Sequence, residues 1–72
     1  MYLKLVVRRG NKTHRTLIPD IERVYTSPVG DDGEMTLDIR RTDGGHEDIF
    51  VDAAKDSVYA MNEDGKTIDT LC

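Results

Sequence analysis

The stretch from residue 8 to residue 15 carries a cluster of basic side chains around a Gly-Asn turn. Its members are Arg8, Arg9, Lys12 and Arg15, with His14 among them. A guanidinium group can bind a carboxylate or a phosphate through two parallel hydrogen bonds. The cluster therefore predicts a site for an anionic partner, either an acidic protein surface or a phosphorylated small molecule. The simpler interpretation, which we favour, is that these side chains pair with acids on adjacent strands and add solubility and register.

Carboxylates dominate the rest of the chain. The candidates for a contact surface are Asp31, Asp32, Asp43 and Asp48. A field of carboxylates can imitate a phosphate backbone and attract a basic, nucleic-acid-binding protein. The net charge of only −4 favours the simpler interpretation, in which these acids keep the surface soluble.

One weak metal pattern is present. His46 and Asp48 are two residues apart, so on a strand both side chains project from the same face, and Asp43 at the preceding turn could lie close. Two or three ligands of mixed type, without a second histidine nearby, are weak evidence for a zinc site. Asp is also common at hairpin ends for its turn propensity alone. The sequence therefore predicts no metal site and no cofactor.

The chain contains few residues that could act as a catalytic nucleophile. Neither Ser27 nor Ser57 is flanked by the glycines of a nucleophile elbow, and Cys72, the one cysteine, lies at a strand end that we expect to fray. Neither histidine has an evident catalytic partner set, and 72 residues leave little room for a water-excluding pocket. We therefore expect a protein that is not an enzyme.

The two signs of charge separate along the chain. Residues 1–30 carry six Lys or Arg against two Asp or Glu, a net of +4, and residues 31–72 carry four against twelve, a net of −8. The overall acidity, with one Phe, three Tyr and no Trp for base stacking, disfavours direct nucleic-acid binding. A protein partner is the expectation that remains.

The elements that must position these residues are short strands. The stretch from Glu34 to Val51 alternates apolar and polar residues on both sides of a Gly-rich turn, which is the mark of a β-hairpin with one buried face. Similar stretches before and after it predict one domain over residues 1–72, an all-β antiparallel meander of six to seven short strands, barrel-like or in two packed sheets. The alternative is an α+β fold with one short helix, at 21–25 or 52–57.

The predicted core follows from this alternation. Its candidates are Leu3, Leu5, Val7, Leu17, Ile21, Val24, Leu37, Ile39, Ile49, Val51, Val58 and Ile68. The aromatic residues do not all fit inside so small a core. Any that fall on an outward sheet face form an apolar patch, which in a soluble protein usually marks a contact surface.

Size and the single cysteine predict association. A core of this size rarely supplies more than about 3–5 kcal/mol, and one cysteine excludes an intramolecular disulfide, so a homodimer is expected. No segment resembles a signal peptide or a membrane span, which together with the free thiol predicts a cytoplasmic protein.

These observations predict a small non-enzymatic module that acts through protein–protein contacts, as a homodimer. One alternative is a small acidic inhibitor or regulator, of the kind that phage and other mobile-element genes encode, acting by charge on a basic partner. The other alternative is a binder of a phosphorylated small molecule at the arginine-rich first hairpin.

Overall fold

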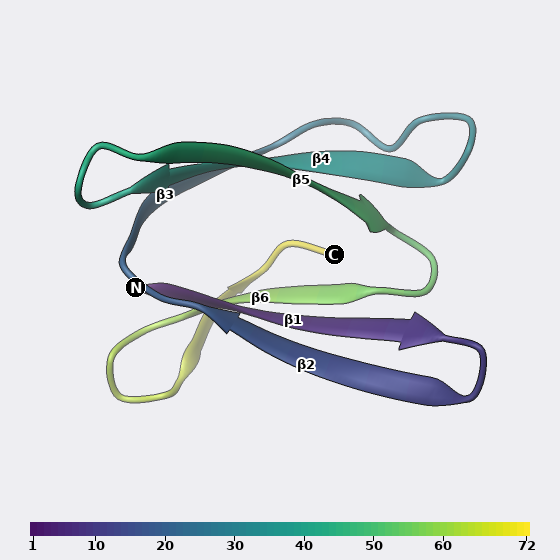
Figure 1. The fold of residues 1–72 in the computed structure, drawn as a ribbon, viewed down its shortest axis with the longest axis horizontal. Helices are drawn as coiled ribbons and strands as arrows, with labels where there is room; N and C mark the ends of the chain where they lie inside the picture. The colour runs from purple at the N-terminus through teal and green to yellow at the C-terminus, as the bar shows by residue number, and fades with distance from the viewer.

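Two antiparallel β-sheets pack face to face in the computed structural model, which describes residues 1–72. One sheet has four strands in the order β2-β1-β6-β7, and the other has three in the order β3-β4-β5 (Figure 1). The strands are β1 (Tyr2–Arg9), β2 (Lys12–Ile18), β3 (Ile21–Thr26), β4 (Glu34–Arg41), β5 (His46–Asp52), β6 (Ser57–Met61) and β7 (Thr67–Thr70). The all-β prediction is confirmed, as two packed sheets and not a closed barrel.

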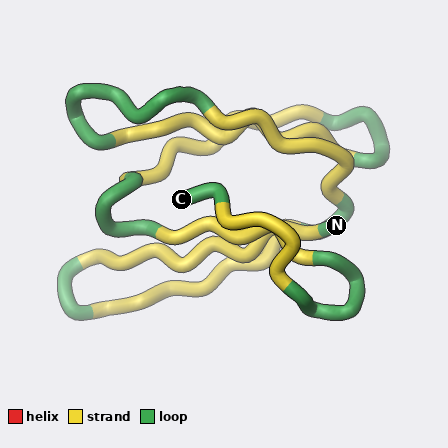
Figure 2. Tube along the Cα trace, turned by 180° about the vertical axis from the view of Figure 1, so that it is seen from behind, coloured by secondary structure: helices red, strands yellow, loops and turns green.

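Neither of the short helices that the alternative fold required is formed (Figure 2). The first expected location lies inside β3. The second is a single turn in which the Asp52 carboxylate accepts hydrogen bonds from the backbone N–H groups of Ala54 and Lys55. Five or six residues cannot repay the cost of nucleating a helix. No helix in the structure is long and apolar enough to cross a membrane.

Hairpin turns define the register within each sheet. Gly10 (φ 63°) lies in the two-residue loop between β1 and β2, and Gly44 (φ 88°) lies in the turn between β4 and β5. Glycine adopts these positive φ values without steric cost. The chain passes between the sheets twice, at Pro19–Asp20 and at the turn after β5. At the first passage the backbone N–H of Ile21 donates to the carbonyl of Met1 at 2.9 Å.

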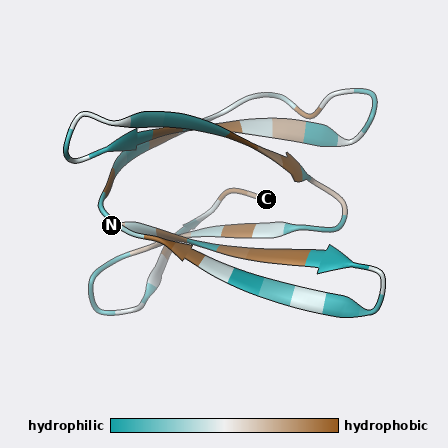
Figure 3. Ribbon diagram, in the orientation of Figure 1, coloured by the Kyte–Doolittle hydropathy of each residue, from teal (hydrophilic) through white to brown (hydrophobic).

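The core lies between the two sheets. It comprises Leu3, Leu5, Ile18, Ile21, Met35, Leu37, Ile39, Val51, Val58 and Ala60. Figure 3 shows the apolar residues concentrated on β1, on β6 and where β2 and β5 end, whereas most of β2 is polar. The chain end after β7 turns into the gap between the layers, where Leu71 and Cys72 pack against the core (Figure 1).

The prediction of core residues is wrong for Leu17 and Ile68, which are exposed. Leu17 is 62% exposed because its neighbour Ile18 is the residue that faces inward, opposite Leu3. Ile68 is 56% exposed because a bulge in the β6–β7 pairing interrupts the alternation there. Val7, Val24 and Ile49 pack against the core but are only partly buried. The prediction omitted Ile18, Met35 and Ala60, which are buried core residues.

Candidate functional site

The outer face of the four-stranded sheet combines basic and apolar side chains. Because Leu3 and Leu5 point into the core, the alternating residues of β1 point outward. The pairing register places residues of β2 and β6 beside them: Lys4 lies between Leu17 and Tyr59, and Val6 lies between Arg15 and Ser57. We call this surface the basic–aromatic face and define it by Tyr2, Lys4, Val6, Arg8, Arg15, Leu17, Tyr59 and Met61.

Apolar groups on this face are covered by their own neighbours. Val6 and Met61 are 8% and 7% exposed, yet neither belongs to the core cluster. Their side chains leave the sheet on its outer side, where Oγ1 of Thr67 on β7 donates to the Met61 sulfur at 3.3 Å. On the same face the Lys4 ammonium lies over the Tyr59 ring, 5.8 Å from its centre. The face is therefore a packed surface with an apolar centre.

The charge of this face is opposite to that of the chain. Lys4, Arg8 and Arg15 provide three positive side chains, and β1, β2 and β6 contain no Asp or Glu. The net charge of the whole protein is −4. An acidic protein thus presents a positive outer surface on these three strands of the sheet.

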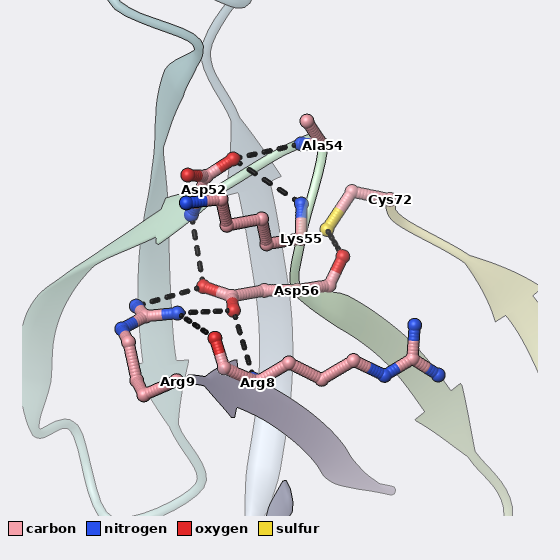
Figure 4. A network of polar contacts seen from close by, with 7 residues as sticks. All are labelled: Arg8, Arg9, Asp52, Ala54, Lys55, Asp56 and Cys72. Atoms are coloured by element: carbon pink, nitrogen blue, oxygen red, sulfur yellow. Dashed lines mark hydrogen bonds and ion pairs between the residues drawn. The ribbon is translucent and has the colours of Figure 1, made fainter. Parts of the chain in front are cut away.

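The predicted basic cluster is divided by the sheet. Arg8 and Arg15 lie on the basic–aromatic face, whereas Arg9 and Lys12, which pair in register, project to the opposite side. Arg9 is engaged by Asp56: Nη1 donates to Oδ1 at 2.8 Å and Nη2 donates to Oδ2 at 3.2 Å (Figure 4). The four residues therefore do not form one anion site.

Asp56 is a buried carboxylate that joins the two sheets. It is 4% exposed, and besides Arg9 it accepts backbone N–H bonds from Arg8 at 3.4 Å and from Asp52 at 2.9 Å. These donors, the Arg9 guanidinium first, hold the pKa of Asp56 below its ordinary value although burial opposes them. In Figure 4 the side chain of Arg8 extends away from this network. The Arg9–Asp56 pair therefore serves the fold.

Two shallow clefts contain arginines. One, of about 430 Å³, is lined by Arg8, Arg9, Gly10, Ala54 and Lys55. The other, of about 320 Å³, is lined by Glu22, Arg23, Tyr25, Arg40, Arg41, Gly44 and Gly45. In the second cleft Asp38 engages Arg40 and Glu47 engages Arg41. Only Arg23 is left there for a phosphate, which is weak support for a ligand.

The predicted acidic candidates are dispersed. Asp31 and Asp32 precede β4, whereas Asp43 follows it, so the length of a strand separates them. Asp32 accepts the N–H of Glu34 at 3.0 Å, and Asp43 accepts that of Gly45 at 2.7 Å, which is turn chemistry. These acids form no continuous field.

Asp48 instead joins Asp38 and His46 on the outer face of the three-stranded sheet. The Nε2 atom of His46 lies 2.8 Å from Asp38 Oδ1 and 3.5 Å from Asp48 Oδ1. Asp38 belongs to the neighbouring strand, so spacing along the chain did not reveal it. The signal that could have found it is the register of the β4–β5 hairpin, which aligns Asp38 with Asp48.

Arg40 stands beside this group. It donates to both carboxylate oxygens of Asp38 at 3.1 Å and lies 6.0 Å from the centre of the Tyr25 ring. This pairing, more than the nearby histidine, holds the pKa of Asp38 below its ordinary value. Arg41 pairs with Glu47 across the same hairpin.

The hydroxyl and thiol groups have structural partners. Ser27 Oγ accepts the N–H of Thr36 at 2.9 Å and donates to the carbonyl of Pro28 at 3.1 Å. Cys72, which we expected at a frayed strand end, packs against the core, and burial raises the pKa of its thiol. A partly buried thiol with a raised pKa is a poor nucleophile.

Comparison with known protein families, with curated proteins and with solved structures finds no match. The function must therefore be argued from the geometry of these two sheet faces.

Proposed function

We propose that this protein is a non-enzymatic binding module that engages the acidic surface of a partner protein through the basic–aromatic face. The observation that carries the proposal is the combination of three cationic side chains, no carboxylate on β1, β2 and β6, and an apolar centre. Interfaces of this kind use a desolvated apolar centre for affinity and charged groups around it for orientation and rate.

The two alternatives from the sequence have less support. Binding of a phosphorylated small molecule at the first hairpin would need Arg9, which is already paired with Asp56. Inhibition of a basic partner by phosphate mimicry would need a continuous row of carboxylates, whereas Asp31 and Asp32 precede β4, Asp43 follows it and Asp48 lies within β5.

A binding titration tests the proposal. The probe is a fluorescein-labelled peptide that alternates glutamate with leucine, measured by anisotropy at low salt. Replacing Lys4 and Arg15 by alanine together should weaken binding at least about tenfold, since truncating a central contact residue costs about 1 kcal/mol or more. The matched control replaces Lys12 and Arg23, which removes the same charge from other surfaces and should change the affinity less than about twofold.

An aromatic pair gives a second, charge-independent comparison. Tyr59→Ala should weaken binding as strongly as the double variant, whereas Tyr25→Ala, on the other sheet and 51% exposed, should not. Equal loss in the test and control variants would mean non-specific attraction and would refute the proposal. Tighter binding of a single-stranded oligonucleotide through the same residues would replace the protein partner by a nucleic acid.

We also propose that two copies associate through β5. This seven-residue edge strand pairs only with β4, so one side of its backbone has no partner in the chain, and Phe50 beside that edge is 69% exposed. Light scattering should give twice the 8.1 kDa mass at micromolar concentration, and Phe50→Lys should reduce it to the monomer. A monomer in the unaltered protein would refute this part alone.

A further inference from the structure

The Asp38–His46–Asp48 group presents a mixed nitrogen and oxygen donor set on one sheet face. Asp38 comes from β4, and His46 and Asp48 come from β5. One ligating atom from each residue lies within 4.8 Å of the other two. The side chains are 31%, 49% and 51% exposed, respectively, so the group is open to solvent.

The hairpin register creates this group. It places Asp38 directly opposite Asp48, while His46 stands two residues before Asp48 on the same face. Two like charges directly opposite each other on neighbouring strands are destabilising. A positive group is therefore favoured beside them, and Arg40 stands next to the pair on this face.

We propose that Asp38, His46 and Asp48 bind one divalent transition-metal ion of the zinc class. Zinc–nitrogen and zinc–oxygen distances of about 2.0–2.2 Å place tetrahedral ligand atoms about 3.4 Å apart. The observed separations of 2.8 Å and 3.5 Å from His46 Nε2 bracket this value. Small changes of rotamer would bring the three atoms onto one ion, and solvent would complete the coordination.

The chemistry of the donors selects the class of ion. An imidazole nitrogen with two carboxylate oxygens suits zinc and its neighbours in the first transition row. Magnesium and calcium prefer sites made wholly of oxygen, and this group supplies too few oxygen ligands for either. Selectivity for zinc or cobalt over magnesium and calcium is therefore part of the proposal.

Arg40 both supports and limits the site. Its Nη2 atom donates to Oδ2 of Asp38 and its Nε atom donates to Oδ1, both at 3.1 Å, which orients the carboxylate with Oδ1 toward His46. Outer contacts of this type orient metal ligands in known sites. Its positive charge also opposes that of the ion, so the affinity should be modest. This inference is independent of the partner proposed for the basic–aromatic face.

Calorimetric titration of the full chain with zinc chloride tests the proposal. The unaltered protein should bind one ion per chain, and His46→Ala and Asp48→Asn should each weaken binding at least about tenfold. The matched controls are His14→Ala, which removes the other histidine, and Cys72→Ser, which removes the only thiol. Both should leave the affinity unchanged.

Cobalt provides a spectroscopic readout that does not depend on heat. Its visible absorption should appear on binding to the unaltered protein, be lost in His46→Ala and persist when magnesium or calcium is present in excess. Circular dichroism of each metal-free variant establishes that it is folded. No binding at millimolar zinc, an isotherm unchanged by His46→Ala, or an equal loss in His14→Ala would overturn the proposal.

Discussion

The Arg9–Asp56 network yields the most direct prediction about stability. Asp56→Asn removes the negative charge and replaces one acceptor oxygen by an NH₂ group that cannot accept a hydrogen bond. At least one of the present donors, which are the Arg9 guanidinium and the backbone N–H groups of Arg8 and Asp52, then loses its acceptor. The Asp56 side chain is 1% exposed, so water cannot readily replace what is lost.

The expected loss is large for so small a domain. Leaving one buried donor unsatisfied costs about 1–3 kcal/mol, and a hydrogen bond to a charged group contributes about 1.5–3 kcal/mol. We expect Asp56→Asn to lower the free energy of unfolding by about 2–4 kcal/mol, out of the roughly 3–5 kcal/mol that a core of this size supplies. Arg9→Ala should cost clearly less than Asp56→Asn, because the Arg9 side chain is 56% exposed and Asp56 keeps its backbone donors.

The pH dependence gives the sign of the effect. The pKa of Asp56 is lower in the folded chain than in the unfolded chain, so the unfolded chain binds more protons. The contribution of the carboxylate is therefore complete above about pH 5 and is lost as the pH falls from about 4 toward the folded value. The difference between the unaltered protein and Asp56→Asn should shrink over the same range.

Urea unfolding followed by circular dichroism measures both quantities. The reasoning would be refuted by an Asp56→Asn variant whose unfolding free energy lies within about 0.5 kcal/mol of the unaltered protein, the range of ordinary surface substitutions. A difference that stays constant from neutral pH to well below pH 4 would refute the linkage argument alone.

Three further predictions concern the core, a turn and the thiol. Leu37→Ala should lower the unfolding free energy by about 2–4 kcal/mol because Leu37 is fully buried, whereas Leu17→Ala should change it by less than about 0.5 kcal/mol. Equal losses of unfolding free energy in urea would contradict the assignment of these two residues to opposite faces of their sheets. Gly44→Ala should cost about 1 kcal/mol because of its φ of 88°, and an unchanged thermal midpoint would argue against that turn geometry. The Cys72 thiol should react slowly with a disulfide reagent at pH 8 because burial raises its pKa, and it should react much faster when the protein is unfolded in urea. Equal reaction rates in the two conditions would mean that the folded structure does not shield the thiol.

The sequence alone was sufficient for the fold class. The period of two around the Gly44 turn identified β4 and β5, and the proline and glycine positions bounded most other strands. These are local signals, because the preference for turns and strands depends on neighbouring residues. Where two adjacent residues were both apolar, as at Leu17 and Ile18, local pattern could not decide which faced inward. The pairing of Ile18 with Leu3 decided it.

The site depended on pairing between distant strands. Along the sequence, Arg8, Arg9, Lys12 and Arg15 are close together. In a sheet, however, neighbouring residues point to opposite sides. Arg9 moreover pairs with Asp56, which lies 47 residues away in the sequence. Spacing likewise suggested Asp43 beside His46 and Asp48, whereas the hairpin register supplied Asp38. The positive face of an acidic protein arose in the same way, because β1 pairs with both β2 and β6, and none of the three strands carries an acid. Residue types and turns are properties of the chain, but which side chains share a face is decided by tertiary pairing.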